Sequence, residues 1–168
     1  MEQARKISKE MITQRGYEII SEDDDSVNAR KPNGDNMIIY FVTDEKLNKK
    51  TATKYMSMMN DSGVKHSIII YADKITTTTL KSLQHSHEIQ LELFGMEEVQ
   101  LNITKHRLQP KSFTRLTPTE SKNFKNTYGV LHPVMKQNDV ISRFYNFKRG
   151  DVIEVVQLND VVTYKIVK

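Results

Sequence analysis

Apolar residues in the first 42 positions recur first with a helical period and then as a buried run. One helical face followed by Gly16 predicts an amphipathic helix over residues 2–15, and that face carries Ala4, Ile7, Met11 and Ile12. A short strand is expected around residues 17–21, and the polar stretch 22–34 is expected to form a mobile loop. The continuous apolar run 37–42 predicts a strand buried on both faces.

The next segments predict a strand, helix, strand unit. Residues 48–61 form a helix by their apolar spacing, which is carried by Ala52, Tyr55, Met56 and Met59. The buried run 67–71 follows at once, so a right-handed parallel crossover is expected. A third helix should begin at the four threonines Thr76 to Thr79 and continue through Leu80 and Leu83 to His87. The alternating residues Ile89, Leu91 and Leu93 predict a half-buried strand.

The second half changes character. Alternation through Val99, Leu101 and Ile103 predicts a strand. Thr117-Pro118-Thr119-Glu120 is a capping box with proline at the first helical position, and it predicts a helix to Tyr128 that stops at Gly129. Asp139 is expected to cap a helix over 140–147 that Gly150 ends, before a hairpin of 152–157 and 161–167 around Asn159-Asp160.

These elements predict two modules. The fold class is α/β with a mixed, partly parallel sheet over residues 1–94, followed by a small α+β module over residues 95–168. Residues 1–94 carry 13 Lys and Arg against 14 Asp and Glu, whereas residues 95–168 carry 12 against 7. The basic excess therefore lies in the second module, which is compatible with nucleic acid or an acidic protein surface.

Composition narrows the class of protein. Hydrophobic residues make up 38% of the 168, no apolar run is long enough to span a membrane, and no signal-peptide pattern opens the chain, so a soluble intracellular protein without membrane contact is expected. The chain has no cysteine and no phosphate-binding, dinucleotide, serine-hydrolase or zinc-protease motif. His85 and His87, the two closely spaced histidines, would point about 200° apart on a helix, so they could not bind one metal ion together. We therefore expect no cofactor, no metal and no small-molecule substrate.

One catalytic alternative remains. The order helix, strand, acidic loop and buried strand, followed by Asp44-Glu45-Lys46, resembles the pattern of restriction endonucleases, in which two carboxylates bind Mg²⁺ and a lysine positions the water. Asp24 or Asp25 would be the upstream ligand. Asp44 to Lys46, however, follow the apolar run instead of lying within it, which favours a solvated turn that caps the next helix.

Two motifs in the second module resemble a known family. Residues 99–110 read VQLNITKHRLQP, similar to L-x-x-N-I-T-x-H-x-L-V-P in the fifth subunit shared by eukaryotic RNA polymerases I, II and III, whose C-terminal domain corresponds to a subunit of archaeal RNA polymerase. Residues 139–155, DVISRFYNFKRGDVIEV, resemble the same family's D-P-V-A-R-Y-x-G-x-K-R-G-x-V-V-K-I. The first module resembles it more loosely, in the strand 38–42, the helix with Lys50-Thr51, Tyr55 and Met59, and the loop 75–79.

The resemblance, which covers most of residues 36–168, implies a function. It implies a non-catalytic polymerase subunit, with a nuclease-like jaw beside downstream double-stranded DNA and an assembly module docked on the largest subunit. The implied DNA-proximal residues are Lys74, Thr76, Thr77, Thr78 and Lys81. The implied subunit-interface residues are Asn102, His106, Arg143, Tyr145, Phe147, Lys148 and Arg149. Some of the aromatic residues must instead pack the module's own core.

The sequence departs from the family in three places. Thr77 stands where the family has a proline near DNA, although the hydroxyls of Thr76 and Thr78 could still reach phosphates. The family's first 35 or so positions are much abbreviated in this chain, and the family's segment before the last strand is reduced to residues 158–160. A jaw this short resembles a copy carried by a large DNA virus. The expected location is the nucleus for a cellular protein and the viral factory or virion for a viral one; a Mg²⁺-dependent nuclease and a free-standing DNA-binding adaptor remain the alternatives.

Overall fold

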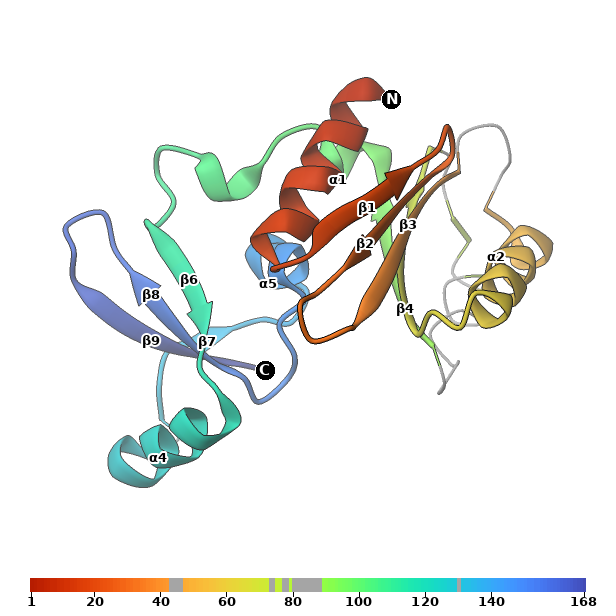
Figure 1. Cartoon of the computed structure of the whole chain (residues 1–168). Coiled ribbons are helices and arrows are strands. Elements are labelled where there is room, and N and C mark those ends of the chain that lie inside the picture. Colours follow the sequence, from red (N-terminus) through yellow and green to blue (C-terminus); the bar gives the residue numbers. More distant parts are fainter. Residues whose placement is uncertain (43–46, 73–74, 77–78, 80–88, 130) are drawn as a thin grey trace. The chain divides into compact units, whose positions relative to one another are not determined.

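The computed structural model describes residues 1–42, 47–72, 75–76, 79, 89–129 and 131–168 (Figure 1). The chain divides into two compact units, which we call the N-terminal unit (Met1–Leu101) and the C-terminal unit (Asn102–Lys168). The boundary between them lies at residues 101 and 102, a few positions beyond the one at residues 94 and 95 expected from the sequence. No helix in the described part of the chain is long and apolar enough to cross a membrane.

The N-terminal unit is built on a five-stranded sheet in the order β1-β2-β3-β4-β5. The strands are β1 (Glu18–Glu22), β2 (Ser26–Arg30), β3 (Asn36–Val42), β4 (His66–Tyr71) and β5 (Gln90–Gly95). β1, β2 and β3 pair antiparallel, whereas β3, β4 and β5 pair parallel. The expected mixed sheet with a parallel crossover is confirmed.

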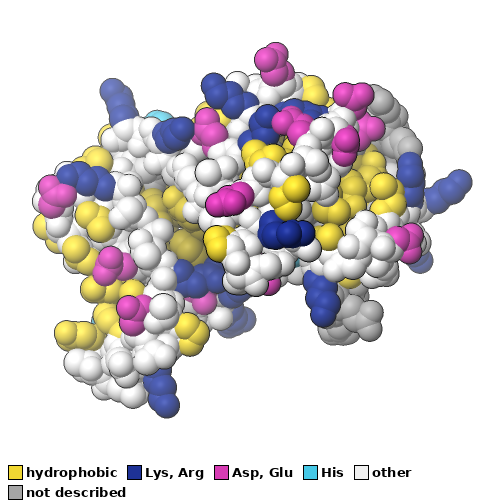
Figure 2. All heavy atoms as spheres, viewed as in Figure 1, with side chains coloured by type: hydrophobic (Ala, Val, Ile, Leu, Met, Phe, Trp, Pro, Cys, Tyr) yellow, Lys and Arg dark blue, Asp and Glu magenta, His cyan; other side chains and the backbone are white. Residues whose placement is uncertain are grey.

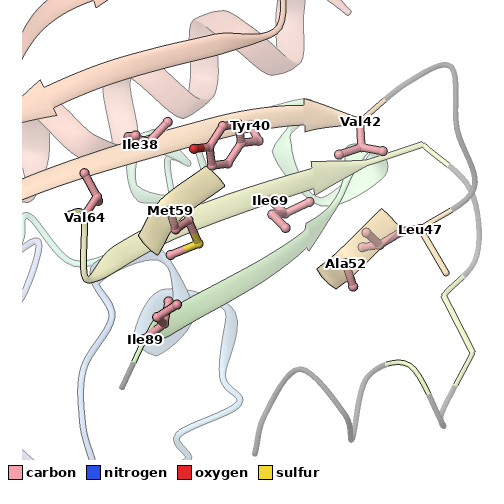
Figure 3. Packing of buried hydrophobic residues seen from close by; sticks show 9 residues of the cluster. All are labelled: Ile38, Tyr40, Val42, Leu47, Ala52, Met59, Val64, Ile69 and Ile89. Carbon is pink, nitrogen blue, oxygen red and sulfur yellow. The ribbon is translucent and has the colours of Figure 1, made fainter. Parts of the chain in front are cut away.

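Two helices cover opposite faces of this sheet because β3 is apolar on both sides (Figure 1). α1 (Glu2–Gln14) buries the predicted face, and Gly16 follows the C-cap residue Arg15 with a φ of 83°, which suits the left-handed position after a helix. On the other face, α2 (Lys49–Asp61) packs Ala52 and Met59 against Tyr40 and Ile69 (Figure 3). Asn48 caps α2 by accepting hydrogen bonds from the backbone N–H groups of Lys50 and Thr51.

Two sequence expectations in the N-terminal unit were wrong. The polar stretch 22–34 contains β2, because Val27 and Ala29 alternate into the core and β3 supplies the hydrogen-bonded neighbour. The alternation through Val99, Leu101 and Ile103 is not a strand: residues Met96–Val99 (η1) and Ile103–Lys105 (η2) form 3-10 helices, and Leu101 between them is exposed. The expected helix over residues 76–87 lies outside the described residues, apart from Thr76 and Thr79.

The C-terminal unit has a four-stranded sheet in the order β6-β8-β9-β7. The strands are β6 (Ser112–Arg115), β7 (Val134–Met135), β8 (Val152–Val156) and β9 (Val162–Val167). The predicted hairpin of β8 and β9 is confirmed, whereas the short edge strands β6 and β7 were not expected. This sheet with flanking helices confirms an α+β arrangement.

A helix covers each face of this second sheet. α4 (Pro118–Tyr128) begins at the predicted capping box and packs Phe124 against Val152 and Ile166. α5 (Val140–Tyr145) is capped by Asp139 and packs Ile141 against Ile153, Val155 and their neighbours on the opposite face. α5 ends at Asn146, which adopts the left-handed conformation, and not at Gly150 as expected. Asparagine tolerates this conformation better than most residues, so the helix stops earlier.

Candidate functional site

Of the DNA-proximal candidates, only Thr76 falls within the described residues. Thr76 is exposed, and its Oγ1 accepts a hydrogen bond from the backbone N–H of Thr79 at 3.3 Å. The two hydroxyl oxygens of Thr76 and Thr79 lie 2.9 Å apart. A hydroxyl that accepts from the backbone N–H three residues later is the contact that the threonine run predicted, whereas the helix expected to follow lies outside the described residues. Lys74, Thr77, Thr78 and Lys81 lie outside the described residues.

The parallel strands fix the edge of the sheet to which Thr76 belongs. β3 and β4 run in the same direction, so the segments after Val42 and Tyr71 leave the sheet at the same edge. The first of these segments leads to Asn48 at the start of α2, and the second leads to Thr76. The carboxyl edge of parallel strands is where open α/β sheets commonly bind ligands.

In the C-terminal unit, the N-I-T motif forms a compact turn. Asn102 is buried and caps η2 (Ile103–Lys105), accepting hydrogen bonds from the backbone N–H and the hydroxyl of Thr104 at 3.1 and 2.6 Å. The Thr104 side chain is also hydrogen-bonded to Tyr145. Burial raises the pKa of Tyr145, and this hydrogen bond partly opposes the shift. Asn102 therefore holds the N-I-T turn in place from the interior of the unit and offers little surface to a partner.

His106 lies at the exposed end of the same motif. Its Nδ1 accepts a hydrogen bond from the backbone N–H of Leu108 at 3.3 Å, and its carbonyl accepts one from Gln109 at 2.8 Å. Because Nδ1 acts as the acceptor, Nε2 carries the proton of the neutral ring. Nε2 is thus a hydrogen-bond donor, next to the exposed Leu108.

The aromatic residues of α5 divide between core and surface. Phe147 is only 5% exposed and belongs to the core with Phe113 and Ile153. The expectation that Phe147 lies at the interface is therefore corrected: its ring fills the C-terminal core because Asn146 turns the chain back under the helix. Tyr145 is half-buried and stacks on Phe147 with ring centroids 5.3 Å apart.

The basic turn after α5 is held in a fixed shape. The backbone N–H of Lys148 donates to Asp151 Oδ2 at 2.7 Å, and Gly150 donates to the carbonyl of Val167 at 2.8 Å. Arg115 of β6 forms an ion pair with Asp151, with Nε and Oδ2 3.0 Å apart. The exposed side chains of Lys148 and Arg149 are therefore presented by an ordered turn, with the half-buried Arg143 on the preceding helix.

Charge and exposed apolar surface concentrate in the C-terminal unit. It carries 12 Lys and Arg against 5 Asp and Glu, whereas the N-terminal unit carries 13 against 16. Among the described residues, eight of the thirteen large exposed hydrophobic side chains also belong to the C-terminal unit. Exposed apolar side chains that form a contiguous patch with polar residues around it mark interaction sites, whereas exposed apolar side chains scattered singly do not.

Sequence reasoning missed a buried ionic cluster in the N-terminal unit. Both guanidinium nitrogens of Arg15 donate to the carboxylate of Glu92, at 2.7 and 2.9 Å. His66 Nε2 lies 2.5 Å from Glu92 Oε1, and its Nδ1 lies 3.3 Å from the Tyr17 hydroxyl. The signal was Glu92 itself, a carboxylate between the apolar Leu91 and Leu93 in a strand expected to be half-buried.

Only the upstream part of the nuclease alternative falls within the described residues. Asp24 and Asp25 are exposed between β1 and β2, and the Arg5 guanidinium donates to the carbonyl of Asp24. Asp44 and Lys46 lie outside the described residues. In the described part of the chain, no group of three His, Asp or Glu side chains could hold a metal ion.

Comparison with known proteins identifies the class. The family model for the C-terminal domain of RNA polymerase Rpb5 matches residues 101–167. A putative DNA-directed RNA polymerase subunit of Invertebrate iridescent virus 6 is 30% identical over 181 aligned positions, which cover 97% of this chain and 97% of the viral protein. The RPABC1 subunit of DNA-directed RNA polymerases I, II and III is 28% identical in Dictyostelium discoideum and 25% identical in Caenorhabditis elegans. These alignments cover 79% of this chain, and 72% and 66% of the two relatives.

Together, the mixed α/β and α+β fold and these matches define a subunit of a DNA-directed RNA polymerase, with a role in transcription. The chain belongs to the RNA polymerase Rpb5 family. It is not itself the catalytic part of the polymerase.

Proposed function

We propose that the chain docks on the largest subunit of its polymerase through the C-terminal unit and holds the N-terminal unit as a jaw beside downstream DNA. One observation carries this proposal: the family match over residues 101–167 coincides with the compact unit 102–168. The part that resembles the family most specifically is thus an independently packed module. A module with its own core can present a rigid surface to a larger subunit.

The C-terminal unit has the surface chemistry of an assembly module. Its net charge is +7, from 12 basic and 5 acidic residues, and it carries most of the exposed apolar side chains described. Aromatic residues and arginine dominate the buried centres of protein interfaces, and opposite charges guide the encounter. We infer a partner surface that is acidic overall with apolar positions within it.

The face formed by η2 and α5 is the proposed contact with the largest subunit. Its outward groups are His106, Arg143, Tyr145, Lys148 and Arg149, all exposed or half-buried. Two further residues support the face from within: Asn102 caps η2, and Phe147 packs under Tyr145. This arrangement keeps the cations on fixed backbone, so less conformational entropy is lost on docking.

The proposed DNA contact of the N-terminal unit is local and weak. The unit carries 13 basic against 16 acidic residues, so it does not attract DNA as a whole. The candidates Lys74, Thr76, Thr77, Thr78 and Lys81 follow β4 in the sequence, and Thr76 is the one that the structure describes. Such a weak contact forms only when the assembled polymerase holds the N-terminal unit next to the duplex. The protein is then located in the same compartment as its polymerase.

The proposal is tested by recovering the partner. Tagged full-length chain, expressed in its natural source and purified at moderate salt, should bring down the largest polymerase subunit. Arg149→Glu should lower this recovery several-fold, because it inverts an exposed charge on the proposed face without removing a described contact. Lys6→Glu is the matched control, because Lys6 is exposed in the N-terminal unit. Recovery of no polymerase subunit would favour a free-standing DNA-binding adaptor.

A further inference from the structure

We propose that the open edge of β7 is a second docking site, which receives an extended, acidic segment of another polymerase subunit as an added strand. This inference takes the assembly into a polymerase from the proposed function. It concerns the opposite side of the C-terminal unit from η2 and α5, where α4 covers the sheet. Its parts are the edge backbone, an exposed apolar surface, an unpartnered nitrogen and a segment without acidic residues.

The backbone of β7 has one free side. β7 is the last strand in the order β6-β8-β9-β7, and within the described residues it pairs with β9 alone. The carbonyls of Pro133 and Met135 accept hydrogen bonds from Ile166 and Lys168, at 2.9 and 3.0 Å. Because backbone groups alternate in direction along a strand, the N–H and C=O of Val134 face away from β9. An open edge of this kind is a template for a further strand.

An exposed apolar surface adjoins this edge. Val134 pairs with Ile166, so its side chain lies on the sheet face that α4 covers, yet it is 49% exposed. Leu131 is 94% exposed and Tyr128 is 67% exposed. The rings of Tyr128 and His132 both lie against Phe124, with centroids 5.2 and 4.7 Å from its own. Yellow side chains accordingly reach the surface around α4 in Figure 2.

His132 carries an unpartnered group at the same place. Its Nε2 is buried and has no hydrogen-bond partner among the described residues. A buried nitrogen without a partner costs free energy, on the order of 1–3 kcal/mol, that the His132 ring could recover by turning outward to a backbone or carboxylate oxygen of a bound segment. The apolar residues and this nitrogen thus favour the same occupant, an extended chain with both side-chain and backbone contacts.

Charge determines the character of that occupant. From Ser121 to Asn138 the sequence has no acidic residue but carries Lys122, Lys125 and Lys136. Lys136 directly follows β7 and is exposed, so a cation lies at one end of the open edge. These lysines would repel a basic protein segment and attract an acidic one. The occupant is therefore an acidic protein segment with apolar residues on alternate positions.

Hydrogen exchange tests the edge directly. The peptide that contains Val134 should exchange readily in the free full-length chain and at least tenfold more slowly in the purified polymerase. Val134→Pro removes the outward N–H and replaces the exposed valine side chain. Proline is tolerated at a strand edge that faces away from its neighbour, so the variant should fold but be retained less in the polymerase. Val134→Thr is the matched control, because it keeps both the N–H and the β-branched shape. Equal exchange in free and assembled protein would overturn the inference.

A second variant covers the case in which proline disturbs the fold. Leu131→Asp changes a side chain that makes almost no contact within the chain, and it should reduce retention several-fold by removing apolar area and repelling an acidic segment. Ile20→Asp, on an exposed isoleucine of β1, is the matched control. A photo-crosslinker at position 131 should capture an acid-rich segment of another subunit. Capture of DNA or of a basic segment contradicts the inference.

The two proposals fail in different ways. Absence of all polymerase subunits from the purified wild-type protein contradicts the proposed function itself. If the Leu131→Asp and Val134→Pro chains stay in the purified polymerase as the wild type does, while the Arg149→Glu chain does not, the β7 site is contradicted and the proposed function is not. Loss of Leu131→Asp with normal retention of Ile20→Asp supports the β7 site.

Discussion

Glu92 is a carboxylate held inside the N-terminal unit by the side chains around it. Its side chain is 12% exposed and that of its ion-pair partner Arg15 is 4% exposed. Burial raises the pKa of Glu92, but the charge of Arg15 and the hydrogen bonds from His66 and Arg15 outweigh it, so the pKa falls to about 2. The pair joins the end of α1 to β5, two elements far apart in the sequence. It therefore fixes the helix on the sheet.

The stability of the protein should follow the charge of Glu92 in acid. The folded pKa lies below the unfolded one, so the stabilisation is complete above about pH 4.5 and is lost as the pH falls toward 2. A shift of this size corresponds to about 3 kcal/mol. Glu92→Gln should lower the free energy of unfolding at pH 7 by about 3–5 kcal/mol, because it leaves a buried guanidinium without its carboxylate. Urea denaturation at several pH values measures both the pH dependence of the wild-type stability and the loss of stability in Glu92→Gln.

The matched control for Glu92→Gln is Glu18→Gln, which removes a charge from the exposed strand β1. Its free energy of unfolding should stay close to that of the wild type at every pH. The difference between wild type and Glu92→Gln should shrink on acidification. A difference that stays constant from pH 7 to pH 2 would show that the carboxylate charge is not what stabilises the pair.

The neighbouring residues Tyr145 and Phe147 should have separate effects. Phe147→Ala removes a ring from the C-terminal core and should cost about 3–5 kcal/mol of unfolding free energy. Tyr145→Phe removes only the hydroxyl that bonds Thr104 and should cost about 0.5–1.5 kcal/mol. Chemical denaturation ranks the two variants. A larger loss for Tyr145→Phe would reverse the assignment of Phe147 to the core and Tyr145 to the surface.

At the scale of elements, the boundary of α4 depends on two reciprocal hydrogen bonds. Thr117 Oγ1 accepts from the backbone N–H of Glu120 at 3.3 Å, and Glu120 Oε2 accepts from the backbone N–H of Thr117 at 2.8 Å. Hydrogen bonds from the Thr117 side chain and backbone lower the pKa of Glu120. The cap is complete when Glu120 is ionised, and it weakens as acid protonates the carboxylate.

Thr117→Ala should shorten α4 and destabilise the C-terminal unit by about 1 kcal/mol. Amides in the first turn of α4 should exchange faster in this variant, while those of β8 change little. Thr119→Ala is the matched control, because Thr119 is exposed two positions further along the same turn. Equal exchange in the two variants would show that the capping box does not determine where α4 begins.

The sequence predicted elements whose signals are local. The capping box at Thr117, the apolar run of β3 and the face of α2 all depend on residues within a few positions of each other, and each was confirmed. β2 was missed because its strand character comes from pairing with β1 and β3, and not from its own polar residues. β7 has only two residues, too few for any period.

The candidate site divides along the same line. The exposed cations Lys148 and Arg149 could be read from their place after a helix. The burial of Phe147 could not, because it depends on the left-handed turn at Asn146, and the pairing of Arg15 with Glu92 joins positions 77 residues apart. Contacts between distant positions carry no local signal in a single sequence.

At the scale of the whole molecule, the two units carry net charges of opposite sign, and different contacts are proposed for them. The C-terminal unit has a net charge of +7, while the N-terminal unit, which is proposed to lie beside DNA, has a net charge of −3. Free protein should therefore bind DNA non-specifically through the C-terminal unit, with a strong dependence on salt. Docking of that unit on an acidic partner would cover these cations. The remaining DNA contact in the assembled enzyme should then depend on few residues.

Lys74 and Lys81 should provide that remaining contact in the assembled polymerase. Replacing both by alanine should reduce crosslinking of downstream DNA to this chain and lower the salt slope of DNA binding by about one for each phosphate that is no longer neutralised. Lys65→Ala is the matched control, an exposed lysine of the same unit. Binding of the assembled enzyme to a downstream duplex, measured from low to moderate salt, gives the slope. If the double variant and Lys65→Ala share the wild-type slope, the N-terminal unit does not contact DNA through these lysines.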